Sequence, residues 1–388
     1  MLLDFTFHNP TKIYFGKTAL DNLSDELKNY GKNILLVYGK SSIKKFGLYD
    51  KVISILKENN KNIVELEGIK SNPTYEQLLK GATLVKEHNI DLILAVGGGS
   101  VIDCCKGISV GAYCEEDVWQ KYYVEGKPVD NKIVPIGSIL TMVGTASEMN
   151  GGSVITNEEV KIKAGRVFDS NVNPKFSILN PELTFTVPYN QMVSGIYDIM
   201  CHLFEQYFSG EDDNTSDYVV EGLLKSLIHS SKIAIQNPQD YEARSNIMWT
   251  STLALNYMAG VSKTQDWEVH MIEHQVGAYT DCPHGIGLAI VSIPYYKHIF
   301  KYGLDKFVRI AKNVWNVEEG NKTKEEIALE GIEKLSEYIK ELKIPTTLRE
   351  IGATEEMLPL IAKSTVLCAG GYKQLTSEEV LEILKACF

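Results

Sequence analysis

The sequence lacks the features that would assign it to a membrane, to secretion or to nucleic acid. No apolar run reaches the roughly 20 residues of a membrane-spanning helix. The N-terminus has neither the basic start nor the apolar core of a secretory signal peptide. Basic residues are outnumbered by acidic ones, 39 to 50, so the net charge is −11. Such a charge disfavours nucleic acid and anionic lipid surfaces as partners, because both require a basic surface.

Cysteine is sparse and follows no pattern. The seven cysteines are an odd set with no Cys-x-x-Cys pair. This usage favours a reducing compartment over a secreted disulfide scaffold. We therefore predict a cytoplasmic protein, and we also find no internal repeat or low-complexity linker.

The first half of the chain alternates strand and helix patterns. Short apolar or β-branched runs predict strands, and apolar positions three and four apart predict helices between them. Alternation of this kind favours a parallel sheet with helices on both faces. The predicted strands cover residues 33–39, 61–66, 91–96 and 133–136, and the predicted helices 49–58 and 75–88.

The second half is dominated by helical patterns, and its apolar run 288–291 also reads as buried helix. Thr186-Val187-Pro188 separates the two halves, because proline interrupts regular structure. We therefore predict an α/β domain over residues 1–187 and an all-helical domain over 188–388, with a cleft between them. The predicted helices are 191–208, 216–237, 241–260, 267–279, 303–314, 324–342 and 377–386.

Histidine is rare, but half of the eight histidines stand in two clusters with metal-ligand spacing. Asp198 and His202 are four residues apart, as are His270 and His274, and His284 follows in Cys-Pro-His-Gly. Residues four apart on a helix share one face, so each pair on its own is also compatible with an ordinary side-chain contact. Taken together, one carboxylate and several imidazoles are typical of a transition-metal site.

Two of the predicted strands are followed by loops that are candidates for nucleotide binding. Gly97-Gly98-Gly99-Ser100 ends a strand and opens a helix, where free N–H groups suit a diphosphate and Ser100 can cap the helix or bond a phosphate. The Gly-x-Gly-x-x-Gly fingerprint is absent. The other loop carries Gly39, Lys40 and Ser42. Without a carboxylate to repel a 2′-phosphate, it favours NADP(H), although Lys40 is also compatible with a solvated loop lysine.

A third loop is rich in small and hydroxyl residues. It runs from Thr141 to Glu148 and contains Thr145 and Ser147. Such a composition suits close backbone contact with a cofactor, although most stretches of this kind are ordinary turns.

These motifs, in this order, resemble the iron-containing (group III) alcohol dehydrogenase family, in its NADPH-dependent butanol dehydrogenase and aldehyde reductase branch. The matching segments span most of the chain. They are Asn9–Gly16, Gly97–Asp103, Gly144–Glu148, Asp198-x-x-x-His202, His270-x-x-x-His274 and Cys282–Gly285.

The resemblance implies a Rossmann-like sheet domain and a helical domain, as in dehydroquinate synthase, with cofactor and metal in the cleft between them. It implies that Asp198, His202, His270 and His284 bind one divalent ion, Fe²⁺ or Zn²⁺, and that His274 faces the cofactor. It implies a homodimer and reversible hydride transfer between NADP(H), preferred over NAD(H), and a short-chain primary alcohol or aldehyde. The implied cofactor contacts are Gly39, Lys40, Ser42, Gly98, Gly99, Ser100, Asp103, Thr141, Thr145, Ser147 and Lys163.

Several alternatives remain open from the sequence. His274 is a candidate proton relay, but it is equally compatible with orienting His270 or bonding the cofactor. Asn180-Pro181 replaces the Asp-Pro of the family, a change that we expect to affect only a turn. Rival functions are a glycerol-type polyol dehydrogenase, a lyase related to dehydroquinate synthase, and a metal-binding protein without enzymatic activity.

Overall fold

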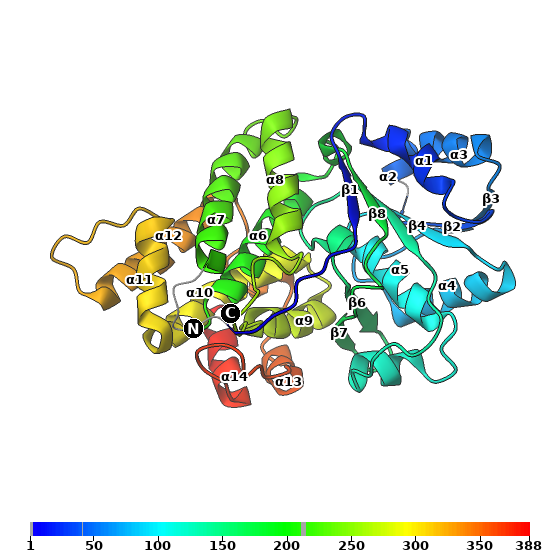
Figure 1. Cartoon of the computed structure of the whole chain (residues 1–388). Helices are drawn as coiled ribbons and strands as arrows, with labels where there is room; N and C mark the ends of the chain where they lie inside the picture. The colour runs from blue at the N-terminus through cyan, green and yellow to red at the C-terminus, as the bar shows by residue number, and fades with distance from the viewer. Residues whose placement is uncertain (1–2, 41, 211–214) are drawn as a thin grey trace. The chain divides into compact units, whose positions relative to one another are not determined.

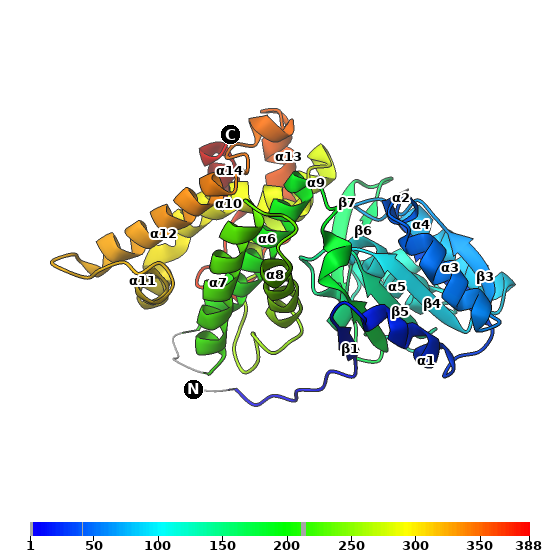
Figure 2. The same ribbon diagram turned by 90° about the horizontal axis from the view of Figure 1, so that it is seen from above.

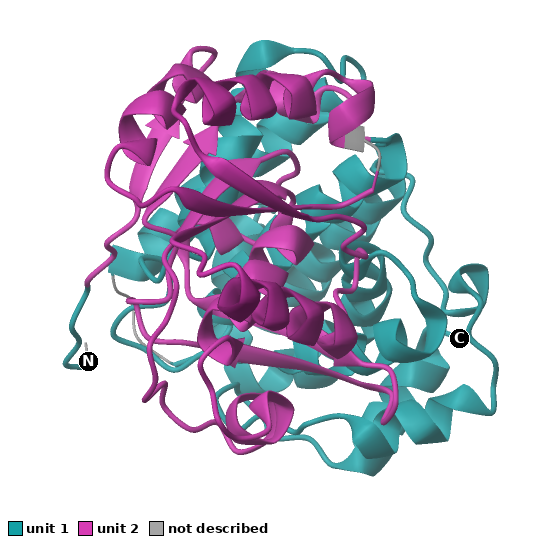
Figure 3. Cartoon of the chain, turned by 90° about the vertical axis from the view of Figure 1, so that its right-hand side faces the viewer, with its two compact units in different colours: residues 1–7, 188–388 teal, residues 8–187 magenta. Residues whose placement is uncertain are grey.

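The chain divides into two compact units in a computed structural model that describes residues 3–40, 42–210 and 215–388, Ser42 by its backbone alone. The sheet unit is His8–Val187 (Figure 3). The helical unit is Pro188–Phe388 together with the N-terminal residues up to Phe7. The Leu3 N–H donates to the Ser262 carbonyl oxygen at 3.1 Å, which ties the start of the chain to the helical unit.

A six-stranded parallel sheet forms the centre of the sheet unit, in the order β1-β8-β5-β4-β2-β3. Figure 1 shows α1 and α3 on one side of this sheet and α4 and α5 on the other. The prediction of a parallel sheet covered by helices is confirmed. The elements are β1 Lys12–Phe15, α1 Leu23–Leu27, β2 Asn33–Tyr38, α2 Ser42–Lys45, α3 Leu48–Glu58, β3 Asn62–Leu66, α4 Tyr75–Glu87, β4 Leu92–Gly97, α5 Gly99–Gly111, β5 Ile136–Leu140, β6 Gly152–Asn157, β7 Ile162–Val167 and β8 Phe176–Leu179.

The central strands are apolar on both faces, so they occur in the sequence as short continuous runs of apolar residues. Every residue of β4 is buried, and β2 is buried from Ile34 onward. One face carries Leu36 and Leu94, which join a core cluster with Leu23 of α1 and Val52 of α3. The burial of these side chains against the layer of α1 and α3 removes a large apolar area from water and holds that layer on the sheet.

Three features of this unit differ from the sequence patterns. The fourth strand was expected at residues 133–136. In the structure it begins at Ile136 and continues to Leu140. Strands β1 and β8 pair beside it, and neither has the long apolar run of a central strand. An antiparallel hairpin, β6–β7, follows the third small-residue loop and packs through β6 against α5.

The helical unit contains only helices as regular elements in its described residues. Figure 2 shows α6, α9 and α10 gathered within it, and these three helices contact one another. The helices are α6 Tyr189–Tyr207, α7 Thr215–Ala234, α8 Tyr241–Ala254, α9 Glu268–Thr280, α10 His284–Ile299, α11 Leu304–Asn313, α12 Lys324–Glu341, α13 Met357–Ser364 and α14 Ser377–Ala386.

In the part of the chain that the structure describes, neither a membrane-crossing helix nor a disulfide is found. Within the described residues, no helix combines the length and the hydropathy that crossing a bilayer requires. All seven cysteines lie in the described part of the chain, and none of them is joined in a disulfide.

A buried lysine anchors the third loop to helix α5. The Lys106 ammonium donates to Ser147 Oγ at 2.7 Å, to Asn150 Oδ1 at 3.0 Å and to the Gly152 carbonyl oxygen at 2.7 Å. Ser147 in turn donates to Asp103, whose other oxygen accepts the Val154 N–H at 3.0 Å. The network therefore joins α5, the third loop and β6 into one rigid piece.

Complete burial lowers the pKa of Lys106 to about 8, although nearby carboxylates oppose the shift. The ordinary pKa is 10.5, so the unfolded chain binds this proton more tightly than the folded one. The buried ammonium therefore destabilises the folded chain by its full amount below about pH 8, and this destabilisation decreases as the pH rises towards 10.5.

We predict that the free energy of unfolding of the native chain, measured relative to Lys106→Met, rises with pH across this window. The slope is at most about 1.4 kcal/mol per pH unit. Urea denaturation of both proteins at several pH values between about 7.5 and 10 measures it. Lys80→Met, at an exposed position of α4, serves as the control with no such slope. A pH-independent difference between the native chain and Lys106→Met would contradict the prediction.

Candidate metal centre and nucleotide loops

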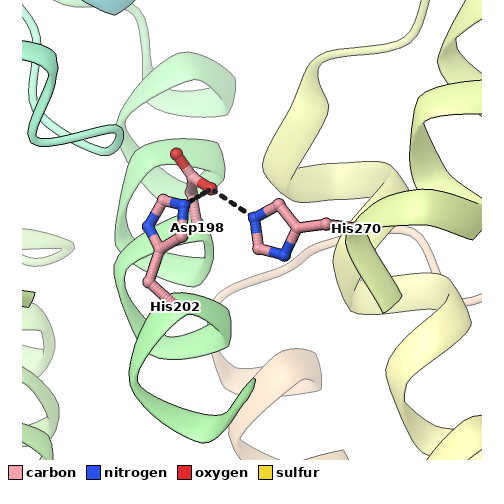
Figure 4. A group of neighbouring side chains, drawn as sticks. All are labelled: Asp198, His202 and His270. Carbon is pink, nitrogen blue, oxygen red and sulfur yellow. Dashed lines mark ion pairs between the residues drawn. The ribbon is translucent and has the colours of Figure 1, made fainter. Parts of the chain in front are cut away.

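Helix α6 carries Asp198 and His202 on one buried face. Every residue of this helix from Met192 to its end is buried, so a charged carboxylate here is shielded from solvent. The side chains of Asp198 and His202 are each 5% exposed. Figure 4 shows dashed lines that join one oxygen of Asp198 to a ring nitrogen of His202 and to a ring nitrogen of His270, which comes from another helix.

Helices α9 and α10 supply the other imidazoles. His270 lies in the first turn of α9, and His284 is the first residue of α10. Gly285 allows α10 to begin this close to α6, because a Cβ atom at that position would overlap the Ser194 carbonyl oxygen. The Gly285 N–H donates to Ser194 Oγ at 3.0 Å, which fixes the start of α10.

One oxygen of Asp198 is the point on which the imidazoles converge. Asp198 Oδ1 lies 3.5 Å from His202 Nε2, 3.7 Å from His270 Nε2 and 3.6 Å from His284 Nε2. Both Asp198 Oδ1 and His270 Nε2 are buried and make no hydrogen bond to any described residue. A buried polar atom without a partner is costly, so its presence at such a cluster indicates a ligand.

The donor set fits a divalent transition metal. One carboxylate oxygen and three imidazole nitrogens suit Zn²⁺ or Fe²⁺, and Asp198, His202 and His270 offer ligand atoms within 4.8 Å of one another. Burial on its own would raise the pKa of Asp198, but the imidazoles of His202 and His284 hold it well below its usual range. The four residues that the sequence proposes as ligands are thus brought together.

His274 lies one helical turn beyond His270 and is also buried. Its ring centroid is 5.7 Å from that of His284 and 6.3 Å from that of His270. It therefore stands beside the cluster, adjacent to two of the imidazoles, which leaves both of its predicted roles open.

Two acidic residues behind the imidazoles were not predicted. Glu205 of α6 bonds Nδ1 of His270, and Glu273 of α9 bonds Nδ1 of His284. Sequence spacing could have indicated Glu205, which follows Asp198 by seven residues and so shares its helical face. Lys106 was missed as well, because nothing in the sequence distinguishes a buried lysine from an exposed one.

In the sheet unit, all three predicted nucleotide loops leave the same edge of the sheet. Gly39 follows β2, Gly98 follows β4 and Thr141 follows β5, and these strands are neighbours in the sheet. The Thr141 N–H donates to the Gly97 carbonyl oxygen at 2.9 Å. In open parallel sheets, ligands bind beyond the carboxyl ends of the strands, so this edge is the candidate nucleotide site.

The glycine loop and the third loop are in contact. A Cβ atom at Gly99 would clash with the Thr145 side chain, so only glycine permits this approach. Helix α5 has Gly98 as its N-cap and no side-chain cap, which leaves its first N–H groups available to an anion. The Ser100 hydroxyl donates to the Ser71 carbonyl oxygen and does not cap the helix, contrary to one of its predicted roles.

The remaining predicted cofactor contacts have different environments. Asp103 and Ser147 are buried in the Lys106 network, and their contact with a cofactor stays a prediction. Lys163 is buried on β7, opposite Thr156 of β6. Lys40 is exposed, and the side chain of Ser42 lies outside the described residues.

Comparison with known proteins identifies the family. Residues 10–181 match the family model "Iron-containing alcohol dehydrogenase", and residues 192–388 match "Fe-containing alcohol dehydrogenase family, C-terminal". The chain is 43% identical over 393 residues to NADH-dependent butanol dehydrogenase A of Clostridium acetobutylicum, covering 100% of both chains. It is 34% identical to NADPH-dependent aldehyde reductase YqhD of Escherichia coli, covering 93% of this chain and 92% of that protein.

The solved structure of NADH-dependent butanol dehydrogenase A from Thermotoga maritima superimposes with a TM-score of 0.94 at 35% identity, covering 100% of this chain and 99% of that one. The predicted resemblance to this family and to its butanol dehydrogenase and aldehyde reductase branch is thereby confirmed, as is the predicted fold class, whereas the preference for NADPH stays a prediction. The chain belongs to the iron-containing alcohol dehydrogenase family, in the branch of the butanol dehydrogenases and aldehyde reductase, and is a nicotinamide-dependent alcohol dehydrogenase.

Proposed function

We propose that the chain catalyses reversible hydride transfer between NADP(H) and a short-chain primary alcohol or aldehyde, with one divalent ion held by Asp198, His202, His270 and His284. The observation that carries this proposal is the convergence of three imidazole Nε2 atoms on one buried carboxylate oxygen. The names of the relatives, butanol dehydrogenases and an aldehyde reductase, support the substrate class.

The helical unit binds the ion and holds its ligands in place. When bound, the divalent ion supplies Lewis acidity towards a carbonyl oxygen, and the nicotinamide supplies or accepts the hydride. Among the four residues that would hold the ion, Asp198 would provide the one negative charge. Because its neighbours are imidazoles and buried apolar residues, water is excluded from much of its surroundings, which strengthens every electrostatic interaction in the site.

His274 is the proposed proton carrier. The hydroxyl proton of an alcohol has to leave as the hydride is removed, and imidazole titrates near neutral pH. His274 is buried beside His284, so its ring can hold a proton close to the cluster.

The sheet unit is proposed to hold the nucleotide along its carboxyl edge. The N-terminus of α5, at Gly98 and Gly99, would take the diphosphate, and Thr141 and Thr145 would line the adjacent loop. Gly39 leaves room and no repelling charge for a 2′-phosphate, and the exposed Lys40 favours it. Relatives that use NADH and relatives that use NADPH both occur, so the preference for NADP(H) is our proposal.

We propose Fe²⁺ or Zn²⁺ as the metal, because the donor set suits both ions. Of the two, Zn²⁺ generally binds such a site more tightly. A homodimeric assembly and a cytoplasmic location stay predictions from the sequence.

We predict that removal of the metal by a chelator abolishes aldehyde reduction and that Fe²⁺ or Zn²⁺ restores it. His270→Ala should lose the metal and the turnover together, because it removes a ligand. His274→Ala should keep the metal and lose about 100-fold in rate, as expected for a lost acid–base group. The turnover of a panel of short aldehydes and of glycerol is measured from the change in nicotinamide absorbance. The metal content of each variant is measured by elemental analysis.

His229→Ala, at an exposed histidine of α7, is the control and should change neither quantity. Equal metal loss in the His270 and His274 variants would show that the ligand assignment is wrong. Faster turnover of glycerol than of any aldehyde would favour the polyol dehydrogenase alternative.

We predict that Gly39→Asp raises the Michaelis constant for NADPH at least about tenfold more than that for NADH, a difference of about 1.4 kcal/mol. A carboxylate here would repel a 2′-phosphate. The backbone accepts the side chain, because a Cβ atom at Gly39 would lie 3.6 Å from the Ile69 carbonyl oxygen, an ordinary contact. Gly39→Asn is the uncharged control of equal size. If Gly39→Asp leaves the preference between NADPH and NADH unchanged, Gly39 does not determine the cofactor specificity.

A further inference from the structure

Glu205 links two of the helices that form the metal centre. It lies on α6, three residues after His202, and its side chain is fully buried. Its Oε2 atom bonds Nδ1 of His270. Its Oε1 atom accepts the Val269 N–H at 2.7 Å and the more distant His270 N–H at 3.4 Å. Each carboxylate oxygen therefore receives at least one donor from the start of α9.

This contact replaces the missing cap of α9. The N-cap residue, Trp267, has the left-handed φ of 69° and forms no side-chain cap. A bulky residue in that conformation is strained and is held only by its surroundings. The Glu205 carboxylate supplies the acceptor that an Asp or Ser N-cap would otherwise provide, and its charge suits the positive end of the helix dipole. One side chain thus fixes both where α9 begins and how the His270 ring is turned.

Glu273 plays the corresponding part for His284. It lies on α9, its side chain is fully buried, and its Oε2 atom bonds Nδ1 of His284. His284 opens α10, so this bond ties the start of α10 to α9.

Both contacts select the same state of the ring. A neutral imidazole that donates its Nδ1–H to a carboxylate keeps its lone pair on Nε2. Nε2 is the atom that faces Asp198 Oδ1, at 3.7 Å in His270 and 3.6 Å in His284. The carboxylates therefore present both nitrogen lone pairs to the same point.

We propose that Glu205 and Glu273 are positioning residues of the metal centre, which fix the tautomer and orientation of His270 and His284 and strengthen metal retention through their negative charge. The inference rests on the proposed metal site. A divalent ion together with the Asp198 carboxylate has a net charge of +1. Including the carboxylates of Glu205 and Glu273 brings the net charge of the centre to −1. A centre of that charge holds its ion tightly.

The decisive variant is Glu273→Gln, which keeps the shape and removes the charge. If the amide oxygen faces Nδ1, the tautomer survives without the negative charge, and if the NH₂ group faces it, the lone pair is forced onto the wrong nitrogen. Either arrangement should lower the affinity for Zn²⁺ by roughly 10- to 100-fold. The melting temperature of the metal-free protein should change little, because either arrangement keeps one hydrogen bond to Nδ1 of His284 and this carboxylate caps no helix.

Chelator competition with Zn²⁺ measures the affinity, and thermal unfolding of the stripped protein measures the stability. A purely structural role would lower the melting temperature and leave the Zn²⁺ affinity of the folded protein intact. In the Zn²⁺-loaded native chain, ¹⁵N-histidine spectra should report Nδ1–H protons on His270 and His284.

Glu268→Gln is the control, with the Zn²⁺ affinities measured above about pH 8, because burial raises the pKa of Glu268 to about 7. Glu268 also lies buried on α9, and its Oε2 atom accepts the Cys368 N–H at 2.7 Å, a bond that glutamine preserves. The Zn²⁺ affinity of this variant should stay within a factor of about three of the native value, or about 0.7 kcal/mol.

Glu205→Gln should lower both the Zn²⁺ affinity and the melting temperature of the metal-free protein. Donors face both carboxylate oxygens of Glu205, and glutamine has only one acceptor oxygen. If that variant fails to fold, Glu273→Gln and its control still decide the question.

The outcomes separate the two proposals. If native protein and His270→Ala bind Zn²⁺ equally well, the proposed metal site is wrong. If His270→Ala loses Zn²⁺ while Glu273→Gln binds it as tightly as the native chain, only the positioning role is wrong. A loss in Glu268→Gln as large as that in Glu273→Gln would also overturn it, because general charge removal would then explain both.

Discussion

The buried carboxylate of Asp198 is the constraint around which the helical unit is arranged. An anion inside a buried helix face is unfavourable unless positive charge or hydrogen bonds compensate for it. Here the compensation comes from three imidazoles that reach the same oxygen from α6, α9 and α10. The close approach at Gly285, the left-handed Trp267 and the carboxylate behind each of two rings all serve that convergence.

Both units use a buried charged side chain to hold a functional segment in place. In the sheet unit, Lys106 ties the third loop to α5, whose N-terminus is the proposed diphosphate site. In the helical unit, Glu205 ties the start of α9 to α6. Burial is unfavourable for each charge, and each is tolerated because several hydrogen bonds satisfy it. The benefit is rigidity, which keeps ligand and cofactor groups within the narrow geometry that catalysis requires.

Family membership leaves the cofactor preference undecided, so the preference depends on local charges around the adenosine ribose. The relatives include a butanol dehydrogenase that uses NADH and an aldehyde reductase that uses NADPH on the same fold. The discriminating phosphate is a single charged group, so a residue or two at the end of β2 can decide the preference without any change in the scaffold. Gly39 and Lys40 occupy that position in this chain.

The sequence by itself determined the alternation of β2, β3 and β4 with helices, the helical second half, and the residue types of the proposed metal ligands, because periodicity and spacing are local properties. It did not reveal β1 and β8, whose runs are short, or the burial of Lys106. Only the tertiary structure brought His284 to Asp198 and placed Glu205 and Glu273 behind the imidazoles. Those contacts join residues that are far apart in the chain or that look like ordinary surface acids, and which side chains meet is decided by helix packing, not by spacing.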